Sequence, residues 1–164
     1  MPSYAFCPLC GSRLAPVTHE GRERLGCPGE GCGYVHWDNP VPVVAAIIEH
    51  EGKVLLARNK LWGPKMFALV TGFLERDESP DAAVLREVKE EVGLDGKIVS
   101  LVGVYPFLLK NQVIIVYHVE TTGEVTLGDE IVEVKLLPYE QVRPWPMGTG
   151  PALADWLERR RAAR

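Results

Sequence analysis

Hydrophobic positions along this 164-residue chain fall mainly into short runs, which predict strands. Apolar runs at residues 43–48 and 53–58 flank Glu51-Gly52, and this arrangement predicts a β-hairpin. Further strands are predicted at residues 67–75, 97–107, 113–121 and 133–138. Because strands and helices are mixed in this order along the chain, the pattern predicts an α/β fold with a mixed sheet.

Two segments have the apolar period of a helix. Ser79-Pro80 predicts the start of the first helix and Gly93 its end, because Ser favours the N-cap, Pro the first turn and Gly the residue after the last turn. Its apolar stripe consists of Val84, Leu85, Val88 and Val92. The second helix is predicted over residues 150–163, with one apolar face formed by Leu153, Trp156 and Leu157.

The first helix carries acidic residues on one face. Glu87, Glu90 and Glu91 stand at i, i+3 and i+4, so a helix projects all three carboxylates in the same direction. A hard divalent cation such as Mg2+ would relieve their mutual repulsion, since it prefers carboxylate oxygens. A solvated face with Arg86 and Lys89 as partners is the alternative. The spacing favours metal-assisted chemistry on a phosphate compound.

Residues 72–94 as a whole resemble the Nudix box, G-x5-E-x7-R-E-U-x-E-E-x-G-U, in which U is a bulky aliphatic residue. Every defined position is matched, by Gly72, Glu78, Arg86, Glu87, Val88, Glu90, Glu91, Gly93 and Leu94. The resemblance implies an α/β/α sandwich with a mixed sheet. It also implies an enzyme that hydrolyses nucleoside diphosphates linked to another moiety, X.

The resemblance further implies roles for the residues of the box. The expected ligands of Mg2+ or Mn2+ are the carbonyl of Gly72 and the carboxylates of Glu87, Glu90 and Glu91. Glu78 is expected to pair with Arg86, which would hold the loop against the helix and orient Glu87.

A second acidic position completes this expectation. In zinc-ribbon members of the family, a Glu just before the last strand completes the metal site or acts as the base, and Glu130 occupies that place, with Glu133 as the near alternative. Either Glu87 or Glu130 would then position or deprotonate the attacking water. A loop acid without a catalytic role is the plain interpretation of Glu130.

All four cysteines lie in the first 32 residues, as the pairs Cys7/Cys10 and Cys27/Cys32. The first pair resembles a zinc knuckle, in which tight turns aim backbone amides at thiolates, and the second has a spacing that fits structural zinc sites. Four thiolates predict a closed Zn2+ site in a zinc ribbon over residues 1–37, ahead of a catalytic domain over residues 38–164. Two disulfides are the alternative, which the reducing cytosol disfavours.

Composition limits the function classes. The net charge of −4 argues against a global electrostatic grip on nucleic acid, and the balance of Arg and Glu in the ribbon favours a structural role. No apolar run approaches the roughly 20 residues of a membrane helix and no secretory signal is evident, so we expect a cytoplasmic protein without a membrane partner. The arginines near the C-terminus are predicted to be solvated at a helix end: Arg159, Arg160, Arg161 and Arg164.

A ribbon ahead of a Nudix domain resembles bacterial NADH pyrophosphatases and a related group of ADP-ribose and FAD pyrophosphatases. The S-Q-P-W-P-F-P-x-S motif of the NADH enzymes is not kept at residues 100–107, where only Ser, Pro and Phe echo it. The expected substrate is therefore a nucleotide-derived small molecule, either ADP-ribose or a dinucleotide such as NADH or FAD. Tyr105 and Phe107 are candidates to stack on its base, with core packing as their alternative.

Two other functions stay open at this point. The chain would act as a pool-cleaning enzyme if it hydrolysed nucleoside triphosphates, or as a sensor if it bound a nucleotide without hydrolysis. The closely spaced, mutually repelling acids argue against the sensor, which has no need of them. The family resemblance also implies a homodimer.

Overall fold

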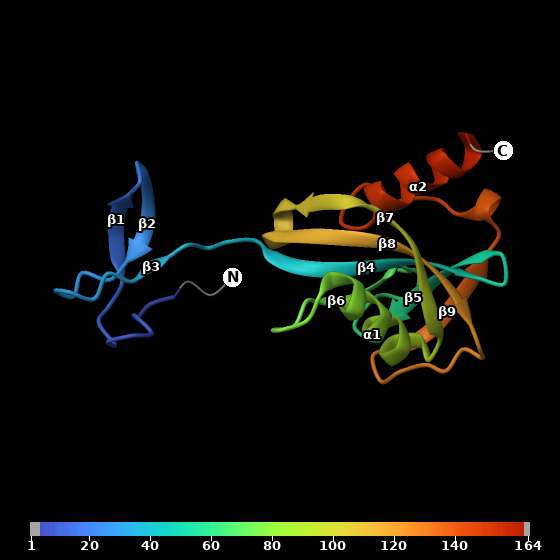
Figure 1. Ribbon diagram of the computed structural model, residues 1–164, viewed down its shortest axis with the longest axis horizontal. Coiled ribbons are helices and arrows are strands. Elements are labelled where there is room, and N and C mark those ends of the chain that lie inside the picture. The colour runs from blue at the N-terminus through green and yellow to red at the C-terminus, as the bar shows by residue number, and fades with distance from the viewer. Residues whose placement is uncertain (1–3, 163–164) are drawn as a thin grey trace. The chain divides into compact units, whose positions relative to one another are not determined.

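The computed structural model describes residues 4–162, and the chain divides between Asn39 and Pro40 into two compact units. The first unit holds an antiparallel sheet of β1 (Ala15–His19), β2 (Arg22–Gly26) and β3 (Val35–His36) (Figure 1). A hairpin thus joins the two cysteine pairs. Its turn, Glu20-Gly21, has two positive φ angles, 51° and 75°, as a type I′ turn requires.

The second unit is built on one six-stranded sheet of mixed direction. Its strands are β4 (Val41–His50), β5 (Lys53–Asn59), β6 (Val70–Phe73), β7 (Asp95–Phe107), β8 (Gln112–Thr122) and β9 (Ile131–Leu137). The order is β7-β8-β4-β5-β9, with β6 also paired to β4. Only β4 and β8 run parallel among these pairings of the described residues. The predicted hairpin around Glu51-Gly52 is confirmed, and this turn repeats the two positive φ angles, 49° and 71°.

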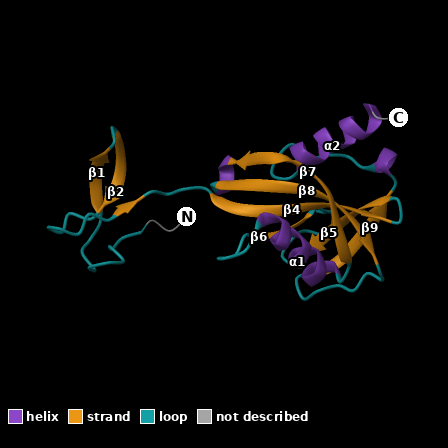
Figure 2. Ribbon diagram, in the orientation of Figure 1, coloured by secondary structure: helices purple, strands orange, loops and turns teal. Residues whose placement is uncertain are grey.

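Two helices cover opposite faces of this sheet, α1 (Pro80–Val92) and α2 (Gly150–Ala162), as Figure 2 shows. Short 3-10 turns follow β7 at Leu108–Lys110 and β9 at Tyr139–Gln141. Side chains of β4 alternate between the two faces of the sheet, because successive side chains of a strand point in opposite directions. This alternation explains why the core has one layer on each face. Val43, Ala45 and Ile47 pack in the cluster that contains α2 residues. Val44, Ala46 and Ile48 pack in the cluster that contains α1 residues. The predicted α/β/α sandwich is confirmed.

The boundaries of α1 lie where the sequence predicts them. Ser79 takes the N-cap position with extended backbone and Pro80 begins the helix. Gly93 ends it at φ 72°, and its N–H donates to the Lys89 carbonyl at 3.0 Å. The Ser79 side chain makes no capping hydrogen bond; it bonds to the Asp81 carboxylate and thereby lowers the pKa of Asp81. The described residues form two α-helices, α1 and α2, and neither is long and apolar enough to cross a membrane.

One of the C-terminal arginines corrects a prediction, and a second makes a contact that was not expected. Arg159 donates to the Val102 carbonyl at 2.9 Å, and Arg160 donates to both carboxylate oxygens of Glu49, at 3.0 and 3.1 Å. Solvation was therefore the wrong expectation for Arg160, because α2 packs on the sheet and this side chain reaches the largely buried Glu49. Arg159 and Arg161 are exposed, as predicted. Arg164 lies outside the described residues.

Glu49 is the centre of a largely buried polar cluster at the end of β4. Its side chain is 15% exposed and accepts hydrogen bonds from Tyr139 Oη, His118 Nε2 (3.1 Å) and Arg160. Burial acts to raise the pKa of Glu49, but the bonds from Tyr139, Arg160 and His118 outweigh it and hold that pKa below its ordinary value. Burial also lowers the pKa of His118, whose ring lies edge-on to Trp156 at 5.0 Å between centroids.

We expect Glu49→Gln to destabilise the protein by about 2 kcal/mol at pH 7, because Arg160 then loses a buried carboxylate partner. In the wild type, the lowered pKa of Glu49 gives stability that is present above about pH 4.5 and is lost as pH falls through the folded-state pKa. The lowered pKa of His118 acts in the same direction below pH 6.5, since the unfolded chain binds the proton first. Urea unfolding at pH 7 and pH 4 measures both effects.

The matched control is Glu124→Gln, which makes the same chemical change at an exposed residue. The variant at Glu49 should lose less stability on acidification than the wild type does, because one of the two titrations is gone. Equal unfolding free energies for both variants would contradict the role of the Glu49 cluster.

Candidate active site and metal centre

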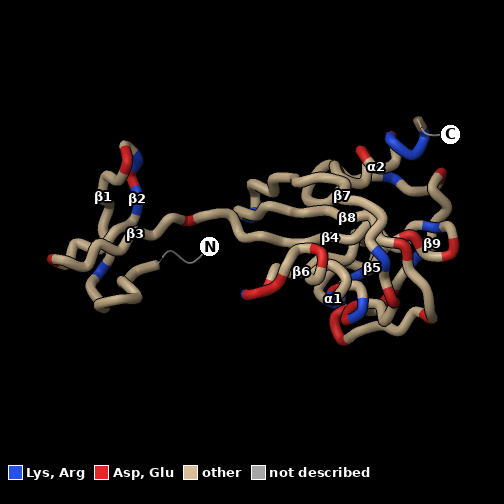
Figure 3. Tube along the Cα trace, in the orientation of Figure 1, with Lys and Arg blue, Asp and Glu red and all other residues tan. Residues whose placement is uncertain are grey.

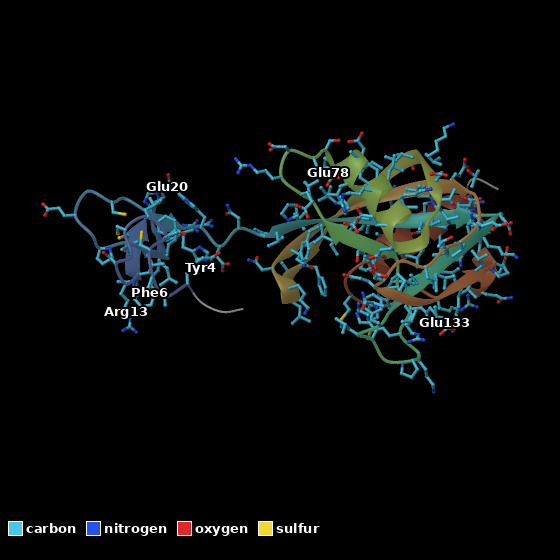
Figure 4. All side chains as sticks on the ribbon, turned by 90° about the horizontal axis from the view of Figure 1, so that it is seen from below. Tyr4, Phe6, Arg13, Glu20, Glu78 and Glu133 are labelled. Atoms are coloured by element: carbon cyan, nitrogen blue, oxygen red, sulfur yellow. The ribbon has the colours of Figure 1, made fainter. Side chains whose placement is uncertain are left out.

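Arg86 joins the acidic residues of α1 to the loop before that helix. Its Nε and Nη2 donate to the two carboxylate oxygens of Glu78 at 2.8 and 2.9 Å, and its Nη1 donates to Glu87 at 2.7 Å and to Glu90 at 3.0 Å. Nη2 also reaches the Phe73 carbonyl at 3.2 Å. The bond to Glu78 is the main cause of the raised pKa of Arg86, and Arg86 in turn lowers the pKa of Glu78. Figure 4 labels Glu78 in this loop.

Gly72 allows the carboxylate of Glu87 to lie against the backbone of β6. Gly72 pairs with Val44 in the sheet, and a Cβ atom at position 72 would stand 1.8 Å from Glu87 Cδ. No side chain fits there unless Glu87 moves. Burial raises the pKa of Glu87 in spite of its bond to Arg86. The structure thus brings together the strand backbone and the first of the helix acids.

The pKa of Glu91 reflects its burial and the closeness of the other acidic side chains. Its pKa is raised to about 8, first by burial and then by the negative charges of Glu87, Glu130 and Glu90. Glu130 therefore lies near the box, although it is distant in sequence. Figure 3 shows acidic positions along α1 and the loop before it. A cation among these carboxylates would take the place of the proton that Glu91 otherwise holds at neutral pH.

The loop that carries Glu130 is fastened to the C-terminal end of α1 by backbone contacts. Gly128 N–H donates to the Glu91 carbonyl at 2.9 Å, which satisfies one of the carbonyls left free at a helix end. A Cβ at Gly128 would stand 2.1 Å from the backbone oxygen of Glu90. Only glycine therefore permits this approach, and the close contact places Glu130 beside the end of α1.

Sequence reasoning did not identify Asn59, which holds Glu130 from the other side. Asn59 Nδ2 donates to Glu130 Oε2 at 3.1 Å, while its Oδ1 accepts from Leu61 N–H at 2.9 Å. Lys60 adds a backbone bond to the Glu130 carbonyl at 2.8 Å. The signal in the sequence is slight, namely polar residues directly after the apolar run of β5. A register shift between Arg58 and Asn59 marks the place in the sheet.

The donor set of α1 fits a hard divalent cation. It offers carboxylate oxygens on one helix face, and the Gly72 contact forms a cradle beside Glu87 that a side chain would fill. The carboxylate oxygens of α1 do not lie as close together as the four cysteine sulfurs do. Among residues 4–162, these sulfurs are the one tight group of three or more potential metal ligands from Cys, His, Asp or Glu. Arg86 lies between Glu87 and Glu90 and supplies the positive charge there.

Tyr105 and Phe107 lie in the core under α2, on the sheet face opposite α1. The Tyr105 hydroxyl donates to Asp155 Oδ2 at 2.8 Å, and burial together with Asp155 raises the pKa of Tyr105 to about 12. Both rings pack against the buried cluster, while remaining partly accessible. The structure does not bring them together with the helix acids, and their stacking on a base remains a prediction.

In the first unit, the four cysteine sulfurs form a second candidate metal centre. Cys7 and Cys32 sulfurs are 3.6 Å apart, Cys10 and Cys27 sulfurs are 3.4 Å apart, and all four lie within 4.8 Å of one another. A tetrahedron with metal–sulfur bonds of about 2.3 Å has edges of about 3.8 Å, so the arrangement fits a tetracoordinate ion. A backbone N–H two residues after the first cysteine of each pair donates to its sulfur at 3.4 Å, as the predicted knuckle turns require.

The comparisons with known proteins agree with this geometry. The NUDIX domain family model matches residues 38–158. The NAD-capped RNA hydrolase NudC of Pseudomonas aeruginosa is 29% identical over 143 residues, which cover 86% of this chain and 50% of that protein. NudC of Mycobacterium bovis is 31% identical, over 88% of this chain and 42% of that protein. The chain therefore spans about half the length of the curated relatives it matches.

Solved structures show the same architecture. A NUDIX hydrolase from Nitrosomonas europaea superposes with a TM-score of 0.81 at 26% identity, over 98% of this chain and 94% of the other. An ADP-ribose pyrophosphatase from Streptococcus suis shares the fold, with a TM-score of 0.63 at 24% identity, over 77% and 96% of the two chains. Since the family model covers most of the chain and includes both the complete box and Glu130, this protein belongs to the NUDIX hydrolase family.

Proposed function

We propose that this protein hydrolyses the pyrophosphate bond of a nucleoside diphosphate linked to another moiety, in a reaction that depends on Mg2+ or Mn2+. The substrate is ADP-ribose or a dinucleotide such as NADH or FAD. The main support is the close group of acids on α1 and Glu130, where burial and the neighbouring negative charges raise the pKa of Glu91 to about 8 in a site that offers oxygen ligands. The similarity to NudC supports a dinucleotide, since NAD is one.

The ligands of the ion would be the carbonyl of Gly72 and the carboxylates of Glu87, Glu90 and Glu91. When bound, the ion supplies neutralisation of phosphate charge and lowers the pKa of a bound water. Arg86 fixes Glu87 and Glu90 in place through Nη1 and holds the preceding loop through Glu78. This preorganisation matters because phosphoryl chemistry depends chiefly on positioning and charge neutralisation.

Glu87 and Glu130 are the two groups proposed to accept the proton of the attacking water. Glu87 has a raised pKa, which brings a carboxylate closer to the range of an effective general base. Glu130 has one oxygen engaged by Asn59, so this side chain is fixed in direction. Two phosphate-bearing products would result, for example AMP and ribose 5-phosphate from ADP-ribose.

NAD-capped RNA is a second candidate substrate, because the curated relatives are NAD-capped RNA hydrolases by name. Capped RNA presents the same pyrophosphate bond as NAD does, so the same acids would act on both. Nucleoside triphosphate hydrolysis and nucleotide sensing without hydrolysis are the remaining alternatives. A single substrate panel distinguishes all of these.

We expect Mg2+-dependent turnover of ADP-ribose, NADH or FAD, measured as phosphate released by phosphatase from the products. Glu90→Gln and Glu91→Gln should each lower kcat by at least about 100-fold, because even residues that only support metal ligands contribute 10–100-fold. Glu158→Gln makes the same change at an exposed position of α2 and should leave kcat unaltered. Full activity in both box variants would refute the assignment, and nucleotide binding without any turnover would establish the sensor.

Gly128→Ala tests the contact that places Glu130. The added Cβ would meet a backbone oxygen at 2.1 Å, which cannot rotate away, so the loop must move from the end of α1. A shift of about 1 Å is enough to lower kcat about 100-fold. Gly63→Ala, where the Cβ meets nothing within 4 Å, is the control. Wild-type kinetics in a folded Gly128→Ala protein would argue against a role for this loop.

We also propose that the ion of the cysteine centre is structural Zn2+. Elemental analysis of protein purified without chelator should find about one zinc per chain. Cys32→Ser should lower the zinc content and expose the amides of the first unit to hydrogen exchange, because one of four ligands is lost. Thr18→Ala, on the exposed side of the hairpin, should keep its zinc. Wild-type protein with no zinc would count against the ribbon.

A further inference from the structure

A cavity lined by arginines lies away from the acidic helix, between the segment that follows β9 and the last turns of α2. Its volume is about 430 Å³, within the range of small-ligand pockets. The apolar part of its lining includes Val142 and Leu157, which are 1% and 3% exposed. The polar part includes Tyr139, Arg143, Arg160 and Arg161.

Arg160 has a buried donor without a partner. Its two terminal nitrogens bond to Glu49, and its guanidinium lies 3.9 Å from the Tyr139 ring centroid, so the group is fixed. Its Nε is buried and makes no hydrogen bond, one of two such side-chain atoms within residues 4–162. A buried donor without an acceptor costs about 1–3 kcal/mol.

The cavity also carries excess positive charge. Three arginines are among its lining residues, and the carboxylates of the described residues that can offset them are Glu49, bonded to Arg160, and Glu140 in the lining. With both acids counted, one positive charge remains. Arg143 Nη1 donates to the backbone carbonyls of Glu140 and Val142, which orients this guanidinium without a carboxylate. Figure 3 shows the basic positions in the last turn of α2.

We propose that this cavity binds a small phosphate monoester. Arg143, Arg160 and Arg161 hold the phosphate, and the organic part lies against Val142 and Leu157. Guanidinium forks match phosphate oxygens in geometry. A phosphate offers three terminal oxygens to three arginines, whereas a carboxylate offers only two. This site is separate from the box and does not depend on the proposed reaction.

The test uses the 164-residue, zinc-loaded chain without added Mg2+ and three probes: AMP, inorganic phosphate and adenosine. In a two-dimensional amide NMR titration, AMP should shift residues 139–144 and 157–161, and adenosine should not. Weaker binding of inorganic phosphate than of AMP identifies a monoester as the ligand; equal binding means that free phosphate is sufficient and overturns the monoester. Absent shifts, or shifts confined to residues 72–91, would also overturn the proposal.

Variants then locate the binding energy. Arg143→Ala/Arg161→Ala should weaken AMP at least about tenfold, since each charged hydrogen bond contributes about 1.5–3 kcal/mol, or roughly 10–100-fold. Arg13→Ala/Arg22→Ala removes the same charge from the first unit and should leave AMP binding unchanged. Arg143→Lys/Arg161→Lys keeps the charge, preserves folding and should still weaken AMP, because it loses the fork. Equal affinity in the cavity variants and the control would refute the site.

Discussion

Repulsion among carboxylates is the constraint on which this structure depends. Burial and three neighbouring carboxylates together raise the pKa of Glu91 to about 8, and nothing in the four acids themselves favours their approach. The structure imposes it through Arg86, which bonds three glutamates, and through two glycines that allow backbone contacts closed to other residues. The stability needed to hold the acids together comes from the apolar layers on either side of β4. Packing of the apolar layers thus offsets the repulsion among the acids.

Local features could be predicted from the sequence because their causes are local. The ends of α1 follow from Pro80 and Gly93, and both hairpin turns follow from a Glu-Gly pair in the left-handed region. The contact between Arg86 and Glu78 could also be expected, since only eight positions separate them and a family pattern contains both. Each of these is decided within one turn, one hairpin or one loop.

Long-range pairs could not be predicted in the same way. Arg160 lies 111 positions from Glu49, and no periodicity in a run of arginines tells which of them will find a buried acid. The roles of Asn59 and Gly128 could not be predicted for a related reason. Both residues position Glu130, and they do so through a loop that the fold brings to the end of α1. The substrate could not be predicted for a similar reason. The sequence alone does not show that Tyr105 and Phe107, the candidates to stack on its base, lie under α2.

The bond between Glu49 and Arg160 joins the first strand of the second unit to its last helix. During synthesis on a ribosome, β4 emerges long before α2 exists. The charged side chain of Glu49 therefore lacks its arginine partner until translation has passed residue 160. Chain growth alone thus sets the earliest moment at which this unit can reach its final state. A nascent chain arrested earlier would expose the apolar face of β4 that α2 later covers, and would be a natural client for chaperones.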